Sequence, residues 1–216
     1  GIEPDLLAQF HLAEEAVSAM GLVVWPMVEF EADDALAAAA AKFRSAAGVE
    51  QVVICSPDKD LAQCVSGGKV VCWDRRRNIV LDEDGVVKKF GVRPASMPDW
   101  LALVGDAADG YPGIEGWGAK SAAAVLYRFG HLEKIPPDPA RWGVNVARAS
   151  FISQNLEDHK KEALLYRRLA TLRIDVPLKE TVKDLRWRGA REGFKRLCHE
   201  LGEEELPARI PLWREG

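Results

Sequence analysis

The stretch QVVICSPDKDLAQCV, residues 51–65, decides the fold class of this 216-residue chain. Its first six residues form a short apolar run rich in β-branched side chains, which is typical of a strand buried in a parallel sheet. The following PDKDLAQCV predicts a helical turn directly after that strand. A buried strand that leads at once into a helix indicates an α/β fold with crossover connections.

The neighbouring segments extend this pattern. Residues 5–20 have helical spacing and end at Gly21, and the apolar run at 22–28 predicts another strand, with Pro26 placing a bulge or an edge there. The alanine-rich stretch at 32–43 predicts a strong helix. KVVCWD and NIVLD flank an arginine-rich turn and predict a hairpin. We therefore expect a doubly wound, mostly parallel α/β sheet.

Beyond residue 98 the strand signal fades and helical patterns dominate. The longest one runs over residues 149–172, and REGFKRLCHELG resembles it in style. Charge changes along the chain as well: residues 1–109 have a balance of −8, and residues 110–216 have a balance of +4. We predict an α/β domain over 1–105 and a helical region over 106–216.

Composition excludes several classes of protein. Hydrophobic residues make up 48% and charged residues 29% of the chain, which is ordinary for a globular protein. The longest alanine run is too short to cross a bilayer, and the N-terminal residues lack the pattern of an export signal. The four cysteines form no CxxC pair, which favours buried thiols in a reducing compartment. We expect a cytoplasmic protein without membrane association.

The acidic side chains gather in three clusters. EFEADDAL and CSPDKDL each follow a predicted strand and start a helix, and GDAADG comes later. The carboxyl ends of parallel strands meet at one crevice, so the first two clusters should lie together. Acids in a first helical turn also stabilise the helix dipole, which is the plain alternative for either cluster alone. The clustered acids are Glu31, Asp33, Asp34, Asp58, Asp60, Asp106 and Asp109.

Carboxylates that converge on one crevice repel one another unless cations lie between them. Oxygen ligands without histidine favour Mg²⁺ or Mn²⁺ over zinc, and no calcium-loop motif is present. Two such ions can bind a scissile phosphate, activate water and stabilise the leaving oxygen. The clusters therefore predict a two-metal phosphodiesterase. A glycosidase would need only two acids.

The segment PGIEGWGAKSAAAVL invites comparison with a nucleotide-binding loop. Counted from Gly113, however, the lysine comes one residue too late for the G-x-x-x-x-G-K-[ST] motif, and no strand precedes it. The remaining alternatives are a glycine turn that serves packing and a hairpin that binds an anion at a helix N-terminus. In the second case backbone N–H groups of Gly113, Gly116 and Gly118 approach a phosphate, assisted by Lys120 and Ser121.

The order EADD, then PDKD, then GDAADG followed at once by PGIEGWGAKSA, resembles the 5′-nuclease family of 5′–3′ exonucleases and flap endonucleases. The resemblance runs from about residue 5 to beyond residue 175. It implies a PIN-like (Rossmann-like) α/β domain followed by a helix–three-turn–helix module, of the helix-hairpin-helix kind, that grips duplex DNA. It further implies that Glu31 and Asp33, with Asp34 close by, hold one metal ion.

The resemblance assigns the second metal ion to Asp58, Asp60, Asp106 and Asp109. It also implies a K⁺ ion bound by backbone carbonyls of the hairpin at 113–118, next to Lys120. Two positions depart from the family pattern GDxSDN, because Ala108 and Gly110 replace its serine and asparagine. The family's first strand, with an aspartate ligand, and its helical arch have no counterpart before GIEPDLLAQF. We expect the chain to be part of a longer protein; the alternative is a naturally short form that lacks part of its first metal site.

Together these observations predict a structure-specific 5′-nuclease that hydrolyses flapped, nicked or branched DNA as a monomer. The rival hypothesis is a non-catalytic protein that binds DNA junctions and has lost part of its metal site. A PIN-type ribonuclease is a third possibility, but it would leave the glycine hairpin unexplained.

Overall fold

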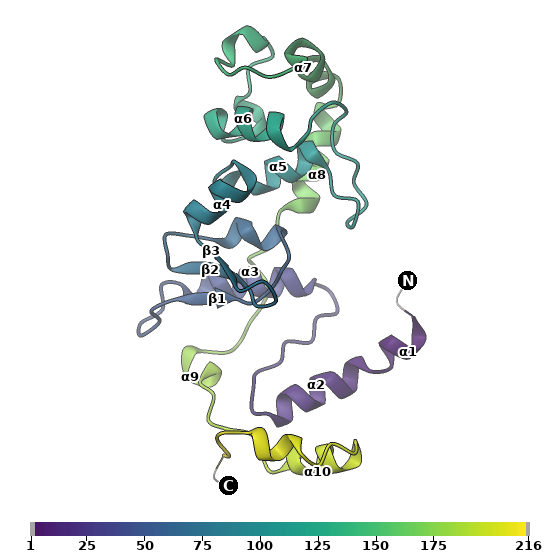
Figure 1. The fold of residues 1–216 in the computed structure, drawn as a ribbon, viewed down its shortest axis with the longest axis vertical. Coiled ribbons are helices and arrows are strands. Elements are labelled where there is room, and N and C mark those ends of the chain that lie inside the picture. Colours follow the sequence, from purple (N-terminus) through teal and green to yellow (C-terminus); the bar gives the residue numbers. More distant parts are fainter. Residues whose placement is uncertain (1–2, 215–216) are drawn as a thin grey trace. The chain divides into compact units, whose positions relative to one another are not determined.

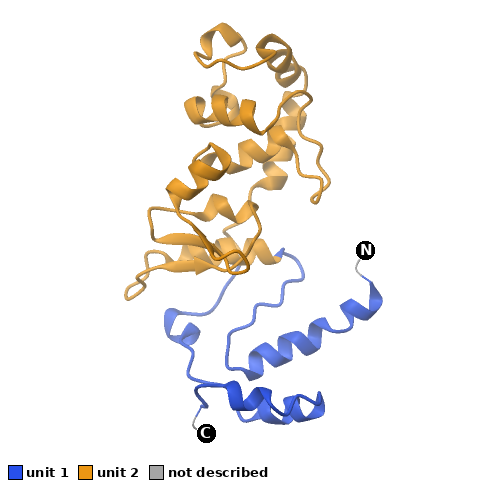
Figure 2. Cartoon of the chain, viewed as in Figure 1, with its two compact units in different colours: residues 1–31, 177–216 blue, residues 32–176 orange. Residues whose placement is uncertain are grey.

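A computed structural model describes residues 3–214 of the chain, shown as a ribbon in Figure 1. The chain divides into two compact units, each described here by itself (Figure 2). Unit 1 combines residues 1–31 with residues 177–216, and unit 2 comprises residues 32–176. The division predicted between residues 105 and 106 lies within unit 2 and stays a prediction.

Unit 2 contains a three-stranded sheet. Its strands are β1 (Val52–Ile54), β2 (Val70–Asp74) and β3 (Ile79–Leu81), in the order β1-β2-β3. Strands β1 and β2 are parallel and are joined through the 3₁₀ helix η1 (Asp60–Cys64), whereas β2 and β3 form the predicted antiparallel hairpin. The expected α/β class is confirmed, and the described sheet has one parallel and one antiparallel pair.

Helix α3 (Ala32–Phe43) has the bounds that its composition predicts. Five of its alanines and Phe43 are buried, and the helix contacts β1 and η1. Small side chains allow a helix backbone to approach a sheet closely, and alanine also has the highest helix propensity. Helix α3 therefore packs against β1 and the 3₁₀ helix that follows it.

The remainder of unit 2 is helical. Helices α5 (Met97–Val104) and α8 (Lys160–Ala170) make its most extensive contact between elements, and α5 also contacts α6 (Ala119–Phe129). One hydrophobic core runs from the sheet through these helices. The other elements are α4 (Glu83–Phe90), η2 (Pro94–Ser96), η3 (Leu132–Lys134), η4 (Pro139–Arg141) and α7 (Ala149–Asp158).

The helical pattern at 149–172 is interrupted once. Helix α7 ends at Asp158, His159 has φ −112° and ψ 29°, and α8 begins at Lys160. The segment is thus two helices, because one residue with non-helical backbone angles is enough to change the direction of the axis without changing the hydrophobic periodicity.

Unit 1 contains α1 (Pro4–Leu7), α2 (Phe10–Ala19), α9 (Val182–Leu185), α10 (Gly193–Glu200) and η5 (Leu206–Arg209). Its small core is formed by Ala190, Phe194 and Cys198, packed against residues of α2 and the C-terminal segment. The strand predicted over residues 22–28 is wrong: these residues form no strand. An apolar run becomes a strand only if it pairs with a neighbour, and Pro26 lacks the N–H that a ladder needs.

Candidate metal centre and glycine hairpin

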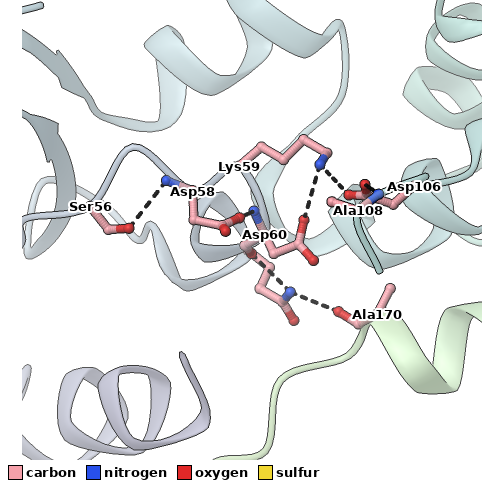
Figure 3. A network of polar contacts seen from close by, with 8 residues as sticks. Ser56, Asp58, Lys59, Asp60, Asp106, Ala108 and Ala170 are labelled. Carbon is pink, nitrogen blue, oxygen red and sulfur yellow. Dashed lines mark hydrogen bonds and ion pairs between the residues drawn. The ribbon is translucent and has the colours of Figure 1, made fainter. Parts of the chain in front are cut away.

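Two aspartates directly after β1 are held by local hydrogen bonds. The backbone N–H of Asp58 donates to Ser56 Oγ at 3.1 Å, and the backbone N–H of Asp60 donates to Asp58 Oδ1 at 2.9 Å. These short-range bonds turn the chain at the strand end and start η1. They also fix Asp60, whose side chain is buried. Figure 3 shows this network from close by.

Gln63 anchors this turn to the end of α8. Its amide Nε2 donates to the carbonyls of Asp60 and Ala170, each at 2.9 Å, and its Oε1 accepts from the N–H of Leu172 at 3.0 Å. One side chain therefore satisfies three backbone groups from segments more than 100 residues apart. Sequence reasoning did not single out Gln63, since nothing local indicates these partners.

The second pair of aspartates lies on the loop after α5. Asp106 and Tyr111 form an isolated antiparallel bridge with N–H to O distances of 2.9 and 3.1 Å. The carboxylate of Asp106 accepts a further bond from the N–H of Ala108 at 3.0 Å. Loop 105–111 is therefore closed on itself, and it presents Asp106 and Asp109 from a fixed backbone.

The structure brings three of the predicted ligands together. One carboxylate oxygen from each of Asp60, Asp106 and Asp109 lies within 4.8 Å of the others. Asp60 and Asp106 are buried and Asp109 is exposed, so the group opens to solvent on one side. Asp60, Asp106 and Asp109 are called the acidic cluster below.

The electrostatics of the acidic cluster favour a bound cation. Burial and the neighbouring carboxylate of Asp58 raise the pKa of Asp60 to about 7. Its Oδ1 atom is buried and has no hydrogen-bond partner among residues 3–214. A buried carboxylate oxygen without a partner is unfavourable unless an ion or water binds it. The donor set, carboxylate oxygens without nitrogen or sulfur, fits a hard divalent ion.

Lys59 is the cationic neighbour of this group. Its Nζ donates to Asp106 Oδ2 and lies 4.0 Å from Asp60 Oδ1 (Figure 3). Burial acts to raise the pKa of Asp106, but the contacts with Lys59 and the N–H of Ala108 outweigh it and lower that pKa. The pKa of Lys59 is raised in turn: burial opposes this, and Asp106 outweighs it. Lys59 was not predicted as a site residue.

Tyr111 is buried close to the carboxylates of the acidic cluster. Its ring is stacked on that of Tyr166, with centroids 5.9 Å apart and planes at 20°. Its hydroxyl is buried and lacks a hydrogen-bond partner within the described part of the chain. Burial and the surrounding carboxylates raise the pKa of this phenol, so it stays neutral and can donate.

The other predicted ligands lie outside the 4.8 Å group. Asp33 and Asp34 are in the first turn of α3, and Asp34 Oδ1 accepts from the N–H of Arg173 at 2.8 Å. The charge of Asp33 contributes to raising the pKa of Cys64 on η1, although burial is the larger cause. Glu31 is the last residue of the N-terminal segment of unit 1. A role of these three residues in metal binding stays a prediction.

The glycine hairpin has the tight geometry that its sequence indicates. Gly113 and Gly116 have φ of +76° and +82°. A Cβ on Gly113 would lie 2.5 Å from the backbone nitrogen of Gly105, and one on Gly116 would lie 2.8 Å from Cε1 of Phe151. Gly118 has an extended φ of −117° and caps α6, so it does not need to be glycine for conformational reasons.

Residues 114–121 tie the hairpin to its surroundings. The N–H of Ile114 donates to Leu103 at 2.9 Å, and Trp117 Nε1 donates to Ile152 at 2.8 Å, with the indole buried. Ser121 Oγ is bonded to both the N–H and the carbonyl of Gly118, each at 3.0 Å. The predicted hydroxyl donor is thus engaged in capping α6, whereas Lys120 is exposed.

An ionic group around the buried Asp99 was not predicted. Asp99 on α5 accepts from the N–H of Leu132 at 3.0 Å and from Arg167 at 3.2 Å, and it contacts His131 Nδ1 at 2.9 Å. Arg167 also binds Glu133 at 2.6 Å, and this hydrogen bond lowers the pKa of Glu133 to about 2. The sequence feature that could have indicated this group is the single carboxylate, Asp99, within the otherwise apolar helix MPDWLALV.

No helix in residues 3–214 is both long and apolar enough to traverse a lipid bilayer.

Two family models match this chain in succession. The N-terminal resolvase-like domain of 5′–3′ exonucleases matches residues 1–91, and their C-terminal SAM fold matches residues 92–193. A 5′–3′ exonuclease of Aquifex aeolicus is 36% identical over 96% of this chain and 67% of its own length. DNA polymerase I of Pseudomonas aeruginosa is 35% identical over 98% of this chain. The chain thus spans about two thirds of the first relative and 22% of the second.

Solved structures agree with the fold. The 5′-exonuclease of phage T5 with bound zinc has a TM-score of 0.62 at 20% identity, over 77% of this chain and 58% of the other. A phage T5 flap endonuclease, solved as a pseudo-enzyme–product complex with DNA and metal ions, has a TM-score of 0.54 at 20% identity, over 68% and 52%. On the two family models and the Aquifex relative, this chain belongs to the 5′–3′ exonuclease family.

Proposed function

We propose that this chain is a metal-dependent 5′-nuclease that hydrolyses phosphodiester bonds of flapped, nicked or branched DNA. The observation that carries the proposal is the short loop that joins the acidic cluster to the glycine hairpin. It bears two residues of the acidic cluster and runs within a few residues into the glycine hairpin. A nuclease needs both a site for the reacting phosphate and a hold on the backbone nearby.

Asp60, Asp106 and Asp109, with Asp58 beside them, would hold one Mg²⁺ or Mn²⁺ ion. Glu31, Asp33 and Asp34 are proposed to hold a second ion. When bound, two such ions activate water and stabilise the leaving oxygen of the scissile bond. The protein's part is to fix the ligands: the Asp106–Tyr111 bridge and the turn at Asp58 hold the carboxylates before any ion arrives.

The hairpin would bind the DNA backbone without reading sequence. Its carbonyl groups are proposed to bind a K⁺ ion that contacts a phosphate, and the N-terminus of α6 favours an anion. Lys120 is exposed at this end of α6 and would add a positive charge. Because such contacts involve phosphates, affinity should fall steeply with salt.

The test is cleavage of a 5′-flap DNA with Mg²⁺ or Mn²⁺. We expect Asp58→Ala combined with Asp60→Ala to abolish cleavage, and Asp84→Asn, an exposed acid of α4, to leave it intact. Equal activity of the double variant and the wild type would refute the metal assignment. Tight flap binding without cleavage in the wild type would favour a junction-binding protein.

We further propose that the protein acts as a monomer in the cytoplasm of a bacterium, close to the chromosomal DNA. The bacterial sources of its relatives support the bacterial origin in this proposal. Light scattering after gel filtration, with and without DNA, tests the monomer: a mass of twice 23.8 kDa would contradict it.

A further inference from the structure

Lys59 contacts two members of the acidic cluster. It is adjacent in sequence to Asp60 but far in sequence from Asp106. Its ammonium binds Asp106, which is 47 residues away, and lies 4.0 Å from Asp60 Oδ1. The side chain of Lys59 is 36% exposed, whereas those of Asp60 and Asp106 are 11% and 6% exposed. A partly exposed cation thus points inward onto two buried anions (Figure 3).

The negative charge of the acidic cluster needs a nearby cation, and Lys59 lies where it can supply one. Among residues 3–214, every ion pair made by Asp60 or Asp106 has Lys59 as its partner. Asp58 adds another negative charge next to Asp60. Like charges at such separations disfavour the ionised state unless a cation offsets them. In this arrangement Lys59 supplies that positive charge from within the chain.

A divalent ion and the ammonium need the same oxygens. A hard cation binds carboxylate oxygens at roughly 2.0–2.6 Å, and two cations on one carboxylate repel each other. Lysine carries its charge on a flexible stem of four carbons, and the exposure of Lys59 leaves a path toward solvent. The ammonium can therefore leave without any rearrangement of the backbone.

We propose that Lys59 is an internal counter-cation, which a divalent metal must displace from Asp60 and Asp106, and which thereby sets the metal concentration at which the site fills. This inference rests on the metal site of the proposed function. It assigns Lys59 a role in metal affinity and not in bond cleavage. It also explains how buried carboxylates remain together before metal binding.

The experiment measures Mn²⁺ binding to the full chain by electron paramagnetic resonance of free Mn²⁺, and thermal unfolding in EDTA. Lys59→Met removes the charge and keeps the length of the side chain, and Lys59→Arg keeps the charge. Lys160→Met is a matched control, because Lys160 is 41% exposed and pairs with Glu157, which is not a proposed ligand. Asp60→Asn identifies the site that is measured.

We expect Lys59→Met to lower the Mn²⁺ dissociation constant about three- to tenfold, the effect of removing one partly exposed competing charge. The same variant should unfold at a lower temperature in EDTA and gain more from Mn²⁺ than the wild type. Lys59→Arg and Lys160→Met should bind Mn²⁺ like the wild type, and Asp60→Asn should bind it more weakly.

Unchanged or weaker Mn²⁺ binding by Lys59→Met would overturn the inference about Lys59 while leaving the metal site intact. A wild type that binds no Mn²⁺ would instead refute the metal site itself. If Lys59→Met folds only with Mn²⁺ while Lys59→Arg folds without it, the inference is supported. If neither variant folds with or without Mn²⁺, Lys59 has a structural role and the inference fails.

Discussion

At the scale of single residues, Gly110 and Gly113 make a matched pair. Both have left-handed backbone, with φ of +79° and +76°. A Cβ on Gly110 would meet nothing within 4 Å, whereas one on Gly113 would lie 2.5–2.7 Å from backbone atoms of residues 103–105. The two positions therefore separate the effect of backbone strain from the effect of a steric clash.

We expect Gly110→Ala to lower the free energy of unfolding by about 1–2 kcal/mol, the strain of an alanine in left-handed conformation. Gly113→Ala should lower it by more than about 3 kcal/mol, because backbone atoms must also move. Urea denaturation of both variants measures the difference. Equal losses would show that the hairpin does not pack on residues 103–105 as described.

The pH dependence of stability is a second prediction for one residue. The pKa of Asp60 is about 7 in the folded chain, against an ordinary value of 3.8. Between these values the folded state binds more protons than the unfolded state, so this residue makes stability fall as pH rises. We expect the free energy of unfolding without metal to fall from pH 4 to pH 7 on account of Asp60.

Asp60→Asn should remove this contribution, so the variant should gain stability relative to the wild type as pH rises through the same window. The slope of that difference is at most about 1.4 kcal/mol per pH unit. Chemical denaturation in EDTA at several pH values measures it, with Asp84→Asn as the exposed control. A constant difference between Asp60→Asn and the wild type would contradict the raised pKa.

At the scale of elements, Asp99 joins α5, α8 and η3. Its side chain is 2% exposed and has three polar partners. Asp99→Ala leaves the N–H of Leu132 without its acceptor, whereas Arg167 keeps Glu133, and we expect the free energy of unfolding to fall by about 1–3 kcal/mol.

Glu133→Gln is the control for Asp99→Ala, because it changes only the half-exposed outer pair with Arg167. Exposed pairs contribute about 1 kcal/mol or less. The two variants are compared by urea denaturation. A loss for Glu133→Gln as large as that for Asp99→Ala would place the stabilising interaction at the surface and not at Asp99.

The elements also show what sequence can predict. Helix α3 has the expected bounds because alanine propensity is a local property. The strand predicted at 22–28 failed because pairing depends on distant partners. The helix at 149–172 was predicted as one because its periodicity continues through the break at His159.

The residues of the site also fall into those that the sequence predicts and those that it does not. Asp60, Asp106 and Asp109 were predictable because each follows a strand or helix end in a recognisable motif, and the structure brings them together. Lys59, Gln63 and Asp99 were missed because their most distant partners lie 47, 109 and 68 residues away. Their roles depend on contacts that the spacing of residues along the chain does not encode.

At the scale of the whole molecule, the main hydrophobic core lies within unit 2 and extends from Ala40 to Ala170. We expect a fragment of residues 32–176 to unfold cooperatively and to bind Mn²⁺ at the acidic cluster. Circular dichroism and Mn²⁺ titration test this, with Asp60→Asn in the same fragment as the control. A fragment without a cooperative transition would show that unit 2 depends on unit 1.

The bridge between Asp106 and Tyr111 and the bond from Ile114 to Leu103 have one further consequence. They hold Asp106, Asp109 and the hairpin in one closed loop, so the distance between these two carboxylates and the hairpin is fixed. For the proposed nuclease, this distance corresponds to a length along the DNA. One residue inserted between Asp109 and Gly113 should therefore shift the position of the cut, and sequencing of the product ends would read that shift.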